Sequence, residues 1–335
     1  MTGTKQRYFV TGATGFIGGK LVGQLREAGH DVVALVRDPG RAQELVRQGV
    51  QLHRGDITDK ASLRAPMEGA DGIFHVAAWY EVGTRDRSRA EAINVGGTRN
   101  VLETMRELQI PRGVYTSSVA VFGNVDGTLP DETYRHGGPW LTLYDRTKWQ
   151  AHYQVADPMI RDGLPLIIVQ PGLVYGPGDH STIRRTFLQF LKRKLVAAPR
   201  GTSYCFGFVD DIARGHVLAM EKGRPGESYI LAGPAHSFIE VFDLAASITG
   251  IPAPRLHPGP RTMSFLADVM AVIGAAVDLP PDFHPESLRV IAGVSYGGND
   301  AKARRELGFA PRPLAEGLRT TLLHEMRLLG MPIQS

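Results

Sequence analysis

The segment Phe9-Val10-Thr11-Gly12-Ala13-Thr14-Gly15-Phe16-Ile17-Gly18-Gly19 decides how the first half of this chain folds. The apolar run Tyr8–Val10 predicts a buried strand, and Ile17, Leu21, Val22 and Leu25 then recur at helical spacing. A strand, a glycine turn and a helix together bring backbone N–H groups and a helix N-terminus up to a pyrophosphate. A Cβ at the glycines would block that approach. The segment therefore predicts a dinucleotide site, with a ligand-free glycine turn as the alternative.

Composition indicates a globular protein of one large or two ordinary domains. The chain has 335 residues, of which 43% are hydrophobic and 21% charged. Its formal net charge of +4 is spread along the sequence without a Lys/Arg block, which argues against nucleic acid as a partner.

Cellular location is predicted from what the sequence contains. The single cysteine, Cys205, excludes internal disulfides and fits a reducing compartment. The first apolar run is a core strand rather than a signal peptide. The apolar run Phe265–Val277 contains Asp268 and is too short to span a bilayer. We therefore expect a cytoplasmic protein with no membrane span.

Strands and helices alternate through the first half of the chain. Apolar runs predict buried strands at 31–36, 50–53, 72–76, 113–117 and 165–170, with helices at 41–48, 88–108 and 144–160. This order predicts an α/β fold, a doubly wound Rossmann-type parallel sheet, with ligands bound beyond the carboxyl ends of the strands.

The pattern changes after Pro171, where prolines and glycines cluster. Apolar helices are predicted at 183–191, 238–249 and 265–277, with short strands such as 229–231 between them. We expect a dinucleotide-binding domain over 1–172, with returns near 207–232, and an interleaved, smaller, mostly helical substrate-binding lobe over 173–335.

The residue after the second strand indicates which nucleotide binds. An acidic residue there suits the ribose 2′-hydroxyl of NAD, and an arginine suits the 2′-phosphate of NADP. Arg37 follows the strand directly, and Asp38 comes next. The sequence thus favours NADP(H), with NAD(H) as the alternative; Arg37 could also be only a solvated loop charge.

Tyr144 and Lys148 stand four residues apart on a predicted helix and so share one face. A nearby ammonium favours the phenolate and lowers the pKa of a tyrosine, which is ordinarily near 10. Ser118 ends a predicted strand at the same sheet edge as the glycine turn, where its hydroxyl could bond a substrate oxygen. These three residues predict a proton-transfer site, against the alternative of an ordinary surface helix.

Several motifs together resemble the extended short-chain dehydrogenase/reductases, most closely the dihydroflavonol reductase-like enzymes of the NAD-dependent epimerase/dehydratase superfamily. Besides the glycine spacing, the resemblance rests on motifs that run nearly from end to end of the chain. They are Gly55-Asp56-Ile57-Thr58-Asp59, His75-Val76-Ala77-Ala78, Asn94-Val95-Gly96-Gly97-Thr98, Ser117-Ser118-Val119-Ala120-Val121-Phe122-Gly123, Tyr144-Asp145-Arg146-Thr147-Lys148 and Gln170-Pro171-Gly172-Leu173-Val174-Tyr175-Gly176-Pro177-Gly178.

The resemblance implies a role for each matching position. Tyr144 would be the catalytic acid/base, Lys148 would lower its pKa, Ser118 would bind the substrate oxygen, and Asn94 would support the lysine. The implied cofactor-binding residues are Gly12, Thr14, Gly15, Phe16, Ile17, Gly18, Arg37, Asp56, Ile57, Ala77, Ala78, Tyr144, Lys148, Pro171 and Gly172. Tyr175 would pack beneath the site, and the family is often dimeric.

Two function classes compete within this resemblance. One is an NADP(H)-dependent oxidoreductase that reduces a ketone or aldehyde on a fairly apolar small molecule. The other is a nucleotide-sugar epimerase or dehydratase that keeps NAD tightly bound. Sugar-nucleotide enzymes usually carry an arginine near the position of Cys205 to hold the substrate diphosphate. A cysteine cannot pair with a phosphate, so its presence at this position favours the reductase. Arginines and lysines at 184, 185 and 192–194 could supply phosphate contacts, but the sequence favours a solvated helix face.

Other readings are weaker. A non-catalytic redox sensor on the same fold would generally lack the tyrosine or the lysine. The eleven histidines show no ligand spacing, so no metal is expected, and His75 and His152 are assigned structural roles. Asp210 and Asp211 are predicted to cap a helix that starts near Ile212. Trp79, Tyr80, Phe122 and Trp140 either line the site or pack in the core.

Overall fold

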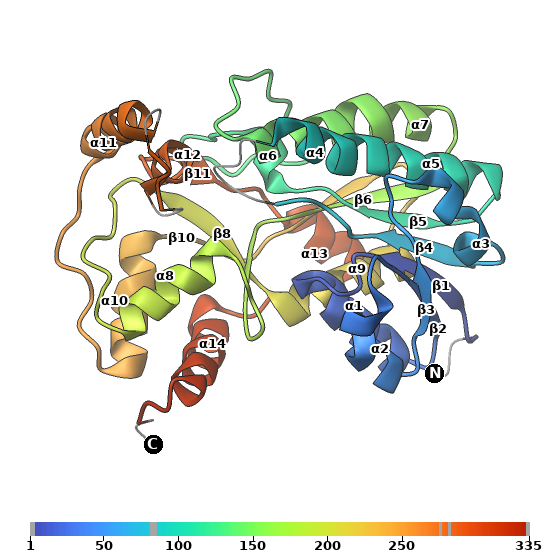
Figure 1. Ribbon diagram of the computed structural model, residues 1–335, viewed down its shortest axis with the longest axis horizontal. Coiled ribbons are helices and arrows are strands. Elements are labelled where there is room, and N and C mark those ends of the chain that lie inside the picture. The colour runs from blue at the N-terminus through green and yellow to red at the C-terminus, as the bar shows by residue number, and fades with distance from the viewer. Residues whose placement is uncertain (1–3, 81–85, 275–276, 281–282, 333–335) are drawn as a thin grey trace.

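The computed structural model describes residues 4–80, 86–274, 277–280 and 283–332. A seven-stranded parallel sheet in the order β3-β2-β1-β4-β5-β6-β9 lies between two layers of helices (Figure 1). Its strands are β1 (Arg7–Thr11), β2 (Asp31–Val36), β3 (Gln51–Arg54), β4 (Gly72–His75), β5 (Gly113–Thr116), β6 (Leu166–Pro171) and β9 (Ser228–Leu231). The predicted Rossmann-type sheet is thereby confirmed.

Both faces of this sheet are buried along its central strands, which explains why these strands are mostly apolar runs rather than alternating ones. In β1, Phe9 packs on one face and Val10 on the other, and neither is exposed. One face is covered by α1 (Phe16–Glu27), α2 (Gln43–Arg47), α9 (Val209–Lys222) and α13 (Ala301–Leu307). The other is covered by α3 (Arg64–Met67), α5 (Thr98–Glu107), η5 (Gln150–Ala156) and α7 (Asp157–Arg161).

Each of the two long helices predicted in the first half contains a π-helical turn. The first consists of α4 (Arg87–Glu91), the π turn η3 (Ala92–Gly97) and α5. The second consists of α6 (Leu143–Trp149), the π turn η5 and α7. Such turns are frequent at functional sites, and here each directly adjoins residues of the predicted site. Short 3-10 turns complete this half: η1 (Pro39–Ala42), η2 (Lys60–Ser62) and η4 (Val119–Phe122).

The later part of the chain contains helices, as expected, and also a second sheet that the sequence pattern did not predict. This sheet consists of β7 (Leu173–Tyr175), β8 (Ser203–Phe208), β10 (Ala235–Ser237) and β11 (Ser295–Tyr296). Three helices share a core cluster with it: α8 (Thr182–Leu191), α10 (Phe238–Thr249) and α14 (Leu314–Leu328). The helices α11 (Pro260–Gly274) and α12 (Pro285–Arg289) contact each other at one end of the molecule (Figure 1).

The predicted cap at Asp210 and Asp211 is wrong. Helix α9 begins at Val209, directly after β8, and its N-cap is Phe208. The two aspartates therefore lie in the first turn, where their charge favours the positive end of the helix dipole. Asp211 also forms a two-point ion pair with Arg312, with N–O distances of 2.8 Å for both contacts.

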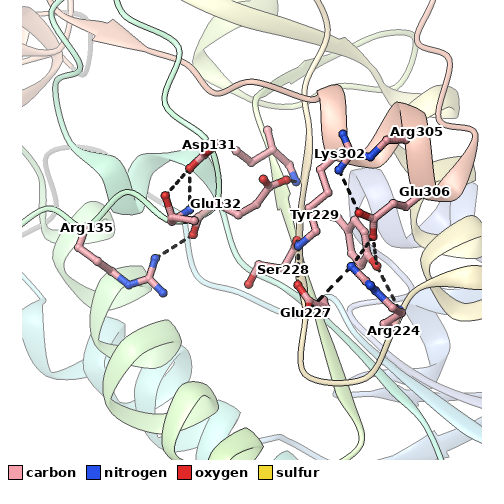
Figure 2. Close-up of polar contacts among 12 residues, drawn as sticks. Asp131, Glu132, Arg135, Arg224, Glu227, Ser228, Tyr229, Lys302, Arg305 and Glu306 are labelled. Carbon is pink, nitrogen blue, oxygen red and sulfur yellow. Dashed lines mark hydrogen bonds and ion pairs between the residues drawn. The ribbon is translucent and has the colours of Figure 1, made fainter.

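Side chains cover the free edge of the large sheet at β9. The backbone N–H of Ile230 donates to a carboxylate oxygen of Glu132 at 2.9 Å, and the carbonyl of Ser228 accepts from Lys302 at 2.8 Å. Figure 2 shows Lys302 of α13 beside Ser228 and Tyr229, and its ammonium lies 4.7 Å from the centre of the Tyr229 ring. Because the Ile230 N–H and the Ser228 carbonyl already have side-chain partners, they are not available for pairing with another strand.

We expect Glu132→Ala to lower the free energy of unfolding by about 1–3 kcal/mol, because the Ile230 N–H loses its acceptor in a half-buried position. Urea unfolding measures the change. Glu132→Gln is the matched control: its amide oxygen still accepts the bond, so its loss should be clearly smaller. Equal losses in the two variants would contradict a role for the acceptor.

Candidate active site

The predicted site residues follow the carboxyl ends of six neighbouring strands of the large sheet. The glycine turn follows β1, Arg37 follows β2, Asp56 and Ile57 follow β3, Ala77 and Ala78 follow β4, Ser118 follows β5, and Pro171 and Gly172 lie at the end of β6. In a parallel sheet these ends meet at one edge, where ligands of such folds bind. The fold therefore gathers residues that are far apart in sequence along one edge.

The glycine turn is too tight for side chains at two positions. Gly12 has φ of +74°, and a Cβ there would lie 2.6 Å from the backbone nitrogen of Ala77. A Cβ on Gly18 would lie 2.1 Å from the carbonyl oxygen of Gly12. Helix α1 can thus start close against the end of β1, with Thr14 and Gly15 exposed at its N-terminus. Such a turn fits a pyrophosphate, since the N–H groups at a helix start and the helix dipole both favour an anion.

The loop after β2 and the turn η1 leave two arginine side chains, those of Arg37 and Arg41, available for a ligand. Asp38 is the N-cap of η1, and its carboxylate accepts from the N–H of Gly40 at 2.9 Å. Arg37 is exposed, and its guanidinium has no hydrogen-bond or ion-pair partner among the described residues.

The remaining residues assigned to the cofactor lie along the same edge. Asp56 accepts from the N–H and the hydroxyl of Thr58, and Ile57 is buried against Gly97. Ala77 donates its N–H to the Thr11 hydroxyl at 3.2 Å, and Ala78 is exposed. A Cβ on Gly172 would lie 2.5 Å from the carbonyl oxygen of Cys205, so this glycine allows β6 to approach β8.

Tyr144 lies in the first turn of α6, where Thr142 is the N-cap. Burial raises the pKa of Tyr144, and Tyr80 and Asp145 add to the increase, whereas a hydrogen bond with Ser118 opposes it. The ring of Tyr80 lies edge-on to that of Tyr144, with 4.8 Å between the ring centres. Ser118 and Tyr144 therefore lie together, and burial holds the phenol in its neutral form.

Ser117 points away from this pair. Its hydroxyl is buried and lies 2.9 Å from Nδ1 of His152, which is itself buried within η5. Ser118 instead is the N-cap of η4, and its hydroxyl accepts from the N–H of Ala120 at 3.1 Å. Of the two serines, only Ser118 is directed at the tyrosine.

Lys148 is fully buried behind Tyr144, and its ammonium donates to the carbonyl of Thr116 at 2.6 Å and to the hydroxyl of Tyr115 at 3.3 Å. Burial lowers the pKa of Lys148 to about 7. No hydrogen bond joins Lys148 to Tyr144 among the described contacts. Tyr115, which the sequence analysis did not single out, is thus a direct partner of the lysine. In the sequence, Tyr115 is marked only by its place in the strand that leads to Ser118.

Asn94 fixes the surroundings of the site rather than the lysine directly. Its side chain lies in the π turn η3, accepts from the N–H of Trp79 at 2.7 Å and donates to the Thr147 hydroxyl at 2.9 Å. Asn94 therefore ties the segment after β4 to the helix that carries Tyr144 and Lys148.

The other residues singled out by the sequence divide between the site and the core. Tyr80 contacts Tyr144, whereas Phe122 is fully buried. Trp140 packs on Trp149, with 5.2 Å between the ring centres. His75 is buried between the hydroxyls of Thr11 and Thr98, and burial lowers its pKa to about 3, so it is neutral.

The described residues also bear on membrane insertion and metal binding. No helix in them is both long and apolar enough to cross a bilayer. They also contain no cluster of three or more His, Cys, Asp or Glu side chains that could hold a metal ion.

Comparisons with known proteins agree with the parallel sheet and its flanking helices. The model of the NAD-dependent epimerase/dehydratase family matches residues 8–232. A provisionally named dihydroflavonol 4-reductase of Synechocystis sp. is 34% identical over 323 residues, which are 93% of this chain and 92% of that protein. The crystal structure of gox2253 matches with a TM-score of 0.82 at 31% identity, covering 98% of this chain and 100% of that one. MoeE5 in complex with UDP-glucuronic acid and NAD matches with a TM-score of 0.76 at 27% identity, covering 96% and 99%.

This chain belongs to the NAD-dependent epimerase/dehydratase family, the extended short-chain dehydrogenase/reductases. It is an NAD(P)-dependent enzyme of that family. Its relatives include reductases, dehydrogenases and epimerases.

Proposed function

We propose that the protein is an NADP(H)-dependent reductase that converts a ketone or aldehyde of a fairly apolar small molecule to an alcohol. The observation that carries the proposal is the pairing of Ser118 with a neutral Tyr144 at the sheet edge that adjoins the glycine turn. A neutral phenol can give a proton to an alkoxide, which is what carbonyl reduction requires.

The residues of this chain would divide the work as follows. The glycine turn and the start of α1 hold the pyrophosphate, and the nicotinamide, when bound, supplies the hydride. Ser118 donates a hydrogen bond to the carbonyl oxygen, and Tyr144 gives that oxygen its proton as negative charge develops. Lys148, when charged, stabilises the tyrosinate left behind. Residues 173–335, apart from the returns near 207–232, would form the substrate-binding part.

The surroundings of Cys205 and of Arg184 support a reductase over a sugar-nucleotide enzyme. Cys205 occupies the place of the expected diphosphate-binding arginine, and its side chain is buried with Sγ 3.8 Å from the carbonyl of Gly298. Arg184 is bound to the buried Glu325 at 2.7 and 2.9 Å, so it is not the solvated charge that the sequence predicted, and it is engaged within the fold. Neither position offers a free guanidinium to a diphosphate.

The cofactor preference rests on the loop after β2. The unpaired Arg37 is suited to a 2′-phosphate, while Asp38 is engaged in capping and so is a poor receptor for a 2′-hydroxyl. We expect Arg37→Ala to weaken NADPH binding about 10- to 100-fold, because a charge-assisted hydrogen bond is lost, and to leave NADH binding nearly unchanged. Fluorescence titration with each nucleotide measures both affinities. Equal weakening of the two would show that Arg37 does not bind the 2′-phosphate.

The nucleotide released by the denatured protein separates the two function classes. A reductase exchanges its cofactor at every turnover, so dialysed protein should be empty and should then bind NADPH more tightly than NADH. About one NAD per chain that survives dialysis would overturn the proposal in favour of a sugar-nucleotide epimerase or dehydratase, which cycles hydride internally.

A further inference from the structure

A buried carboxylate lies directly beside the proposed catalytic tyrosine. Asp145 follows Tyr144 in the first turn of α6 and is 3% exposed. No cation pairs with it among the described residues. A buried charge without a counter-ion is costly, so its hydrogen bonds must be what holds it in place.

The first set of these bonds fixes the start of the catalytic helix. The backbone N–H of Asp145 donates to the hydroxyl of Thr142, the N-cap residue, at 3.1 Å. Hydrogen bonding with Thr142 also lowers the pKa of the Asp145 carboxyl. The Thr142 hydroxyl therefore caps the helix and fixes the turn on which Tyr144 lies.

The second set reaches the smaller sheet. The hydroxyl of Tyr296, in β11, donates to the Asp145 carboxylate at 2.7 Å. The Tyr296 ring is stacked on that of Tyr204 in β8, with 5.6 Å between the ring centres. The Tyr204 hydroxyl donates to the carbonyl of Val290 at 2.6 Å. The carboxylate thus joins the helix of Tyr144 to the part of the chain proposed to bind substrate.

The charged state of Asp145 follows from the groups that face it. Burial raises its pKa to about 6, the hydrogen bonds from Tyr296 and Thr142 oppose the increase, and Glu286 of α12 adds to it. The other titratable groups around it are the phenols of Tyr80, Tyr144 and Tyr204. At neutral pH the carboxylate is therefore ionised, and its negative charge disfavours a second negative charge on Tyr144.

We infer that Asp145 is a positioning residue that, with Tyr296, fastens the first turn of the Tyr144 helix to the smaller sheet, and that its charge adds to the burial that keeps Tyr144 protonated. The inference rests on the proposed function for its catalytic meaning. Its two parts, the charge and the fastening, are tested by two different variants.

Asp145→Asn tests the charge. The amide has the shape of the carboxylate and can still accept from Tyr296, but it carries no charge. Tyrosinate absorbance is titrated against pH for each protein with and without Tyr144→Phe, and the difference isolates Tyr144. We expect Asp145→Asn to lower the pKa of Tyr144, by less than burial and Tyr80 raise it. An unchanged pKa would overturn the charge part.

Asp157→Asn is the matched control for this titration. Asp157 is a half-buried carboxylate on the same helical run as Asp145. It lies 12 residues further along the chain, which is about 18 Å at the rise of a helix. Its removal should leave the pKa of Tyr144 unchanged. A shift equal to that of Asp145→Asn would also overturn the charge part, because it would show a general effect.

Tyr296→Phe tests the fastening. It removes one hydroxyl and leaves the carboxylate, which is still ionised at the alkaline pH where Tyr144 titrates, so the pKa of Tyr144 should stay close to that of the unchanged protein. We expect kcat for reduction of a carbonyl substrate by NADPH to fall about tenfold, with KM and the affinity for NADPH unchanged, because only the aim of Tyr144 is affected. An unchanged kcat would overturn the fastening part.

The proposed function fails independently of this inference. The tyrosinate titration needs neither substrate nor turnover, so it reports on Asp145 whatever reaction the enzyme performs. Retained NAD in the dialysed protein would overturn the reductase and leave the titration result standing.

Discussion

Tyr144→Phe is expected to lower the rate of carbonyl reduction by about 10²- to 10⁴-fold, the usual contribution of a positioned general acid. The substitution removes the one proton that the site can deliver to the carbonyl oxygen, because Lys148 is turned toward Thr116 and Tyr115. NADPH should still bind with nearly normal affinity, since the glycine turn and Arg37 are untouched. Steady-state kinetics and fluorescence titration measure the two effects separately.

Tyr153→Phe is the matched control, because Tyr153 is another tyrosine on the same helical run, in η5. It should keep turnover within a few-fold of the unchanged protein. Near-normal turnover in Tyr144→Phe would remove Tyr144 from the proposed mechanism. If that variant also kept the protein's effect in the cell, a non-catalytic nucleotide sensor would be the better account.

Gly18→Ala is expected to destabilise the fold by roughly 3 kcal/mol or more and to abolish nucleotide binding. The reason is a collision, since the added Cβ would lie 2.1 Å from the carbonyl oxygen of Gly12. That oxygen belongs to the turn itself, so relief requires α1 to move away from the end of β1. Urea unfolding measures the loss of stability, and NADPH titration measures the loss of the site.

Gly23→Ala makes the same change in the same helix, where nothing lies within 4 Å of the added Cβ. Since alanine favours the helix over glycine by up to about 1 kcal/mol, this control should be neutral or slightly stabilising. If Gly18→Ala proved as stable as Gly23→Ala and bound NADPH normally, the close packing of the turn would have no role.

The sequence predicted most of the large sheet because both of its faces are buried. Buried parallel strands are uninterrupted apolar runs, and each recurs between helical patterns, so Asp31–Val36 and Leu166–Pro171 are visible without any tertiary information. The smaller sheet escaped prediction because three of its four strands are short. β7 and β10 have three residues and β11 has two, which is fewer than the four to eight residues over which a strand pattern can be recognised.

The site could be predicted only where its residues follow strands or share a helix face. Tyr144, Lys148 and Ser118 satisfy that condition. Tyr115 was missed because its side chain lies within a strand that looks like core, and its hydroxyl meets Lys148 only after β5 packs against α6. The contact of Tyr80 with Tyr144 likewise depends on how the segment after β4 folds back over the site.

By itself, the sequence determined the alternation of strand and helix, the glycine turn and the placing of Tyr144 and Lys148 on one helix face, because these features are local in the chain. Only the tertiary structure decided the partners of these residues: the capping role of Asp38, the ion pair of Arg184 with Glu325, and the bond of Asp145 with Tyr296. The physical reason is that burial and hydrogen bonding between distant segments fix the charge and the aim of a side chain. Both depend on which segments pack together, and a linear pattern does not record that.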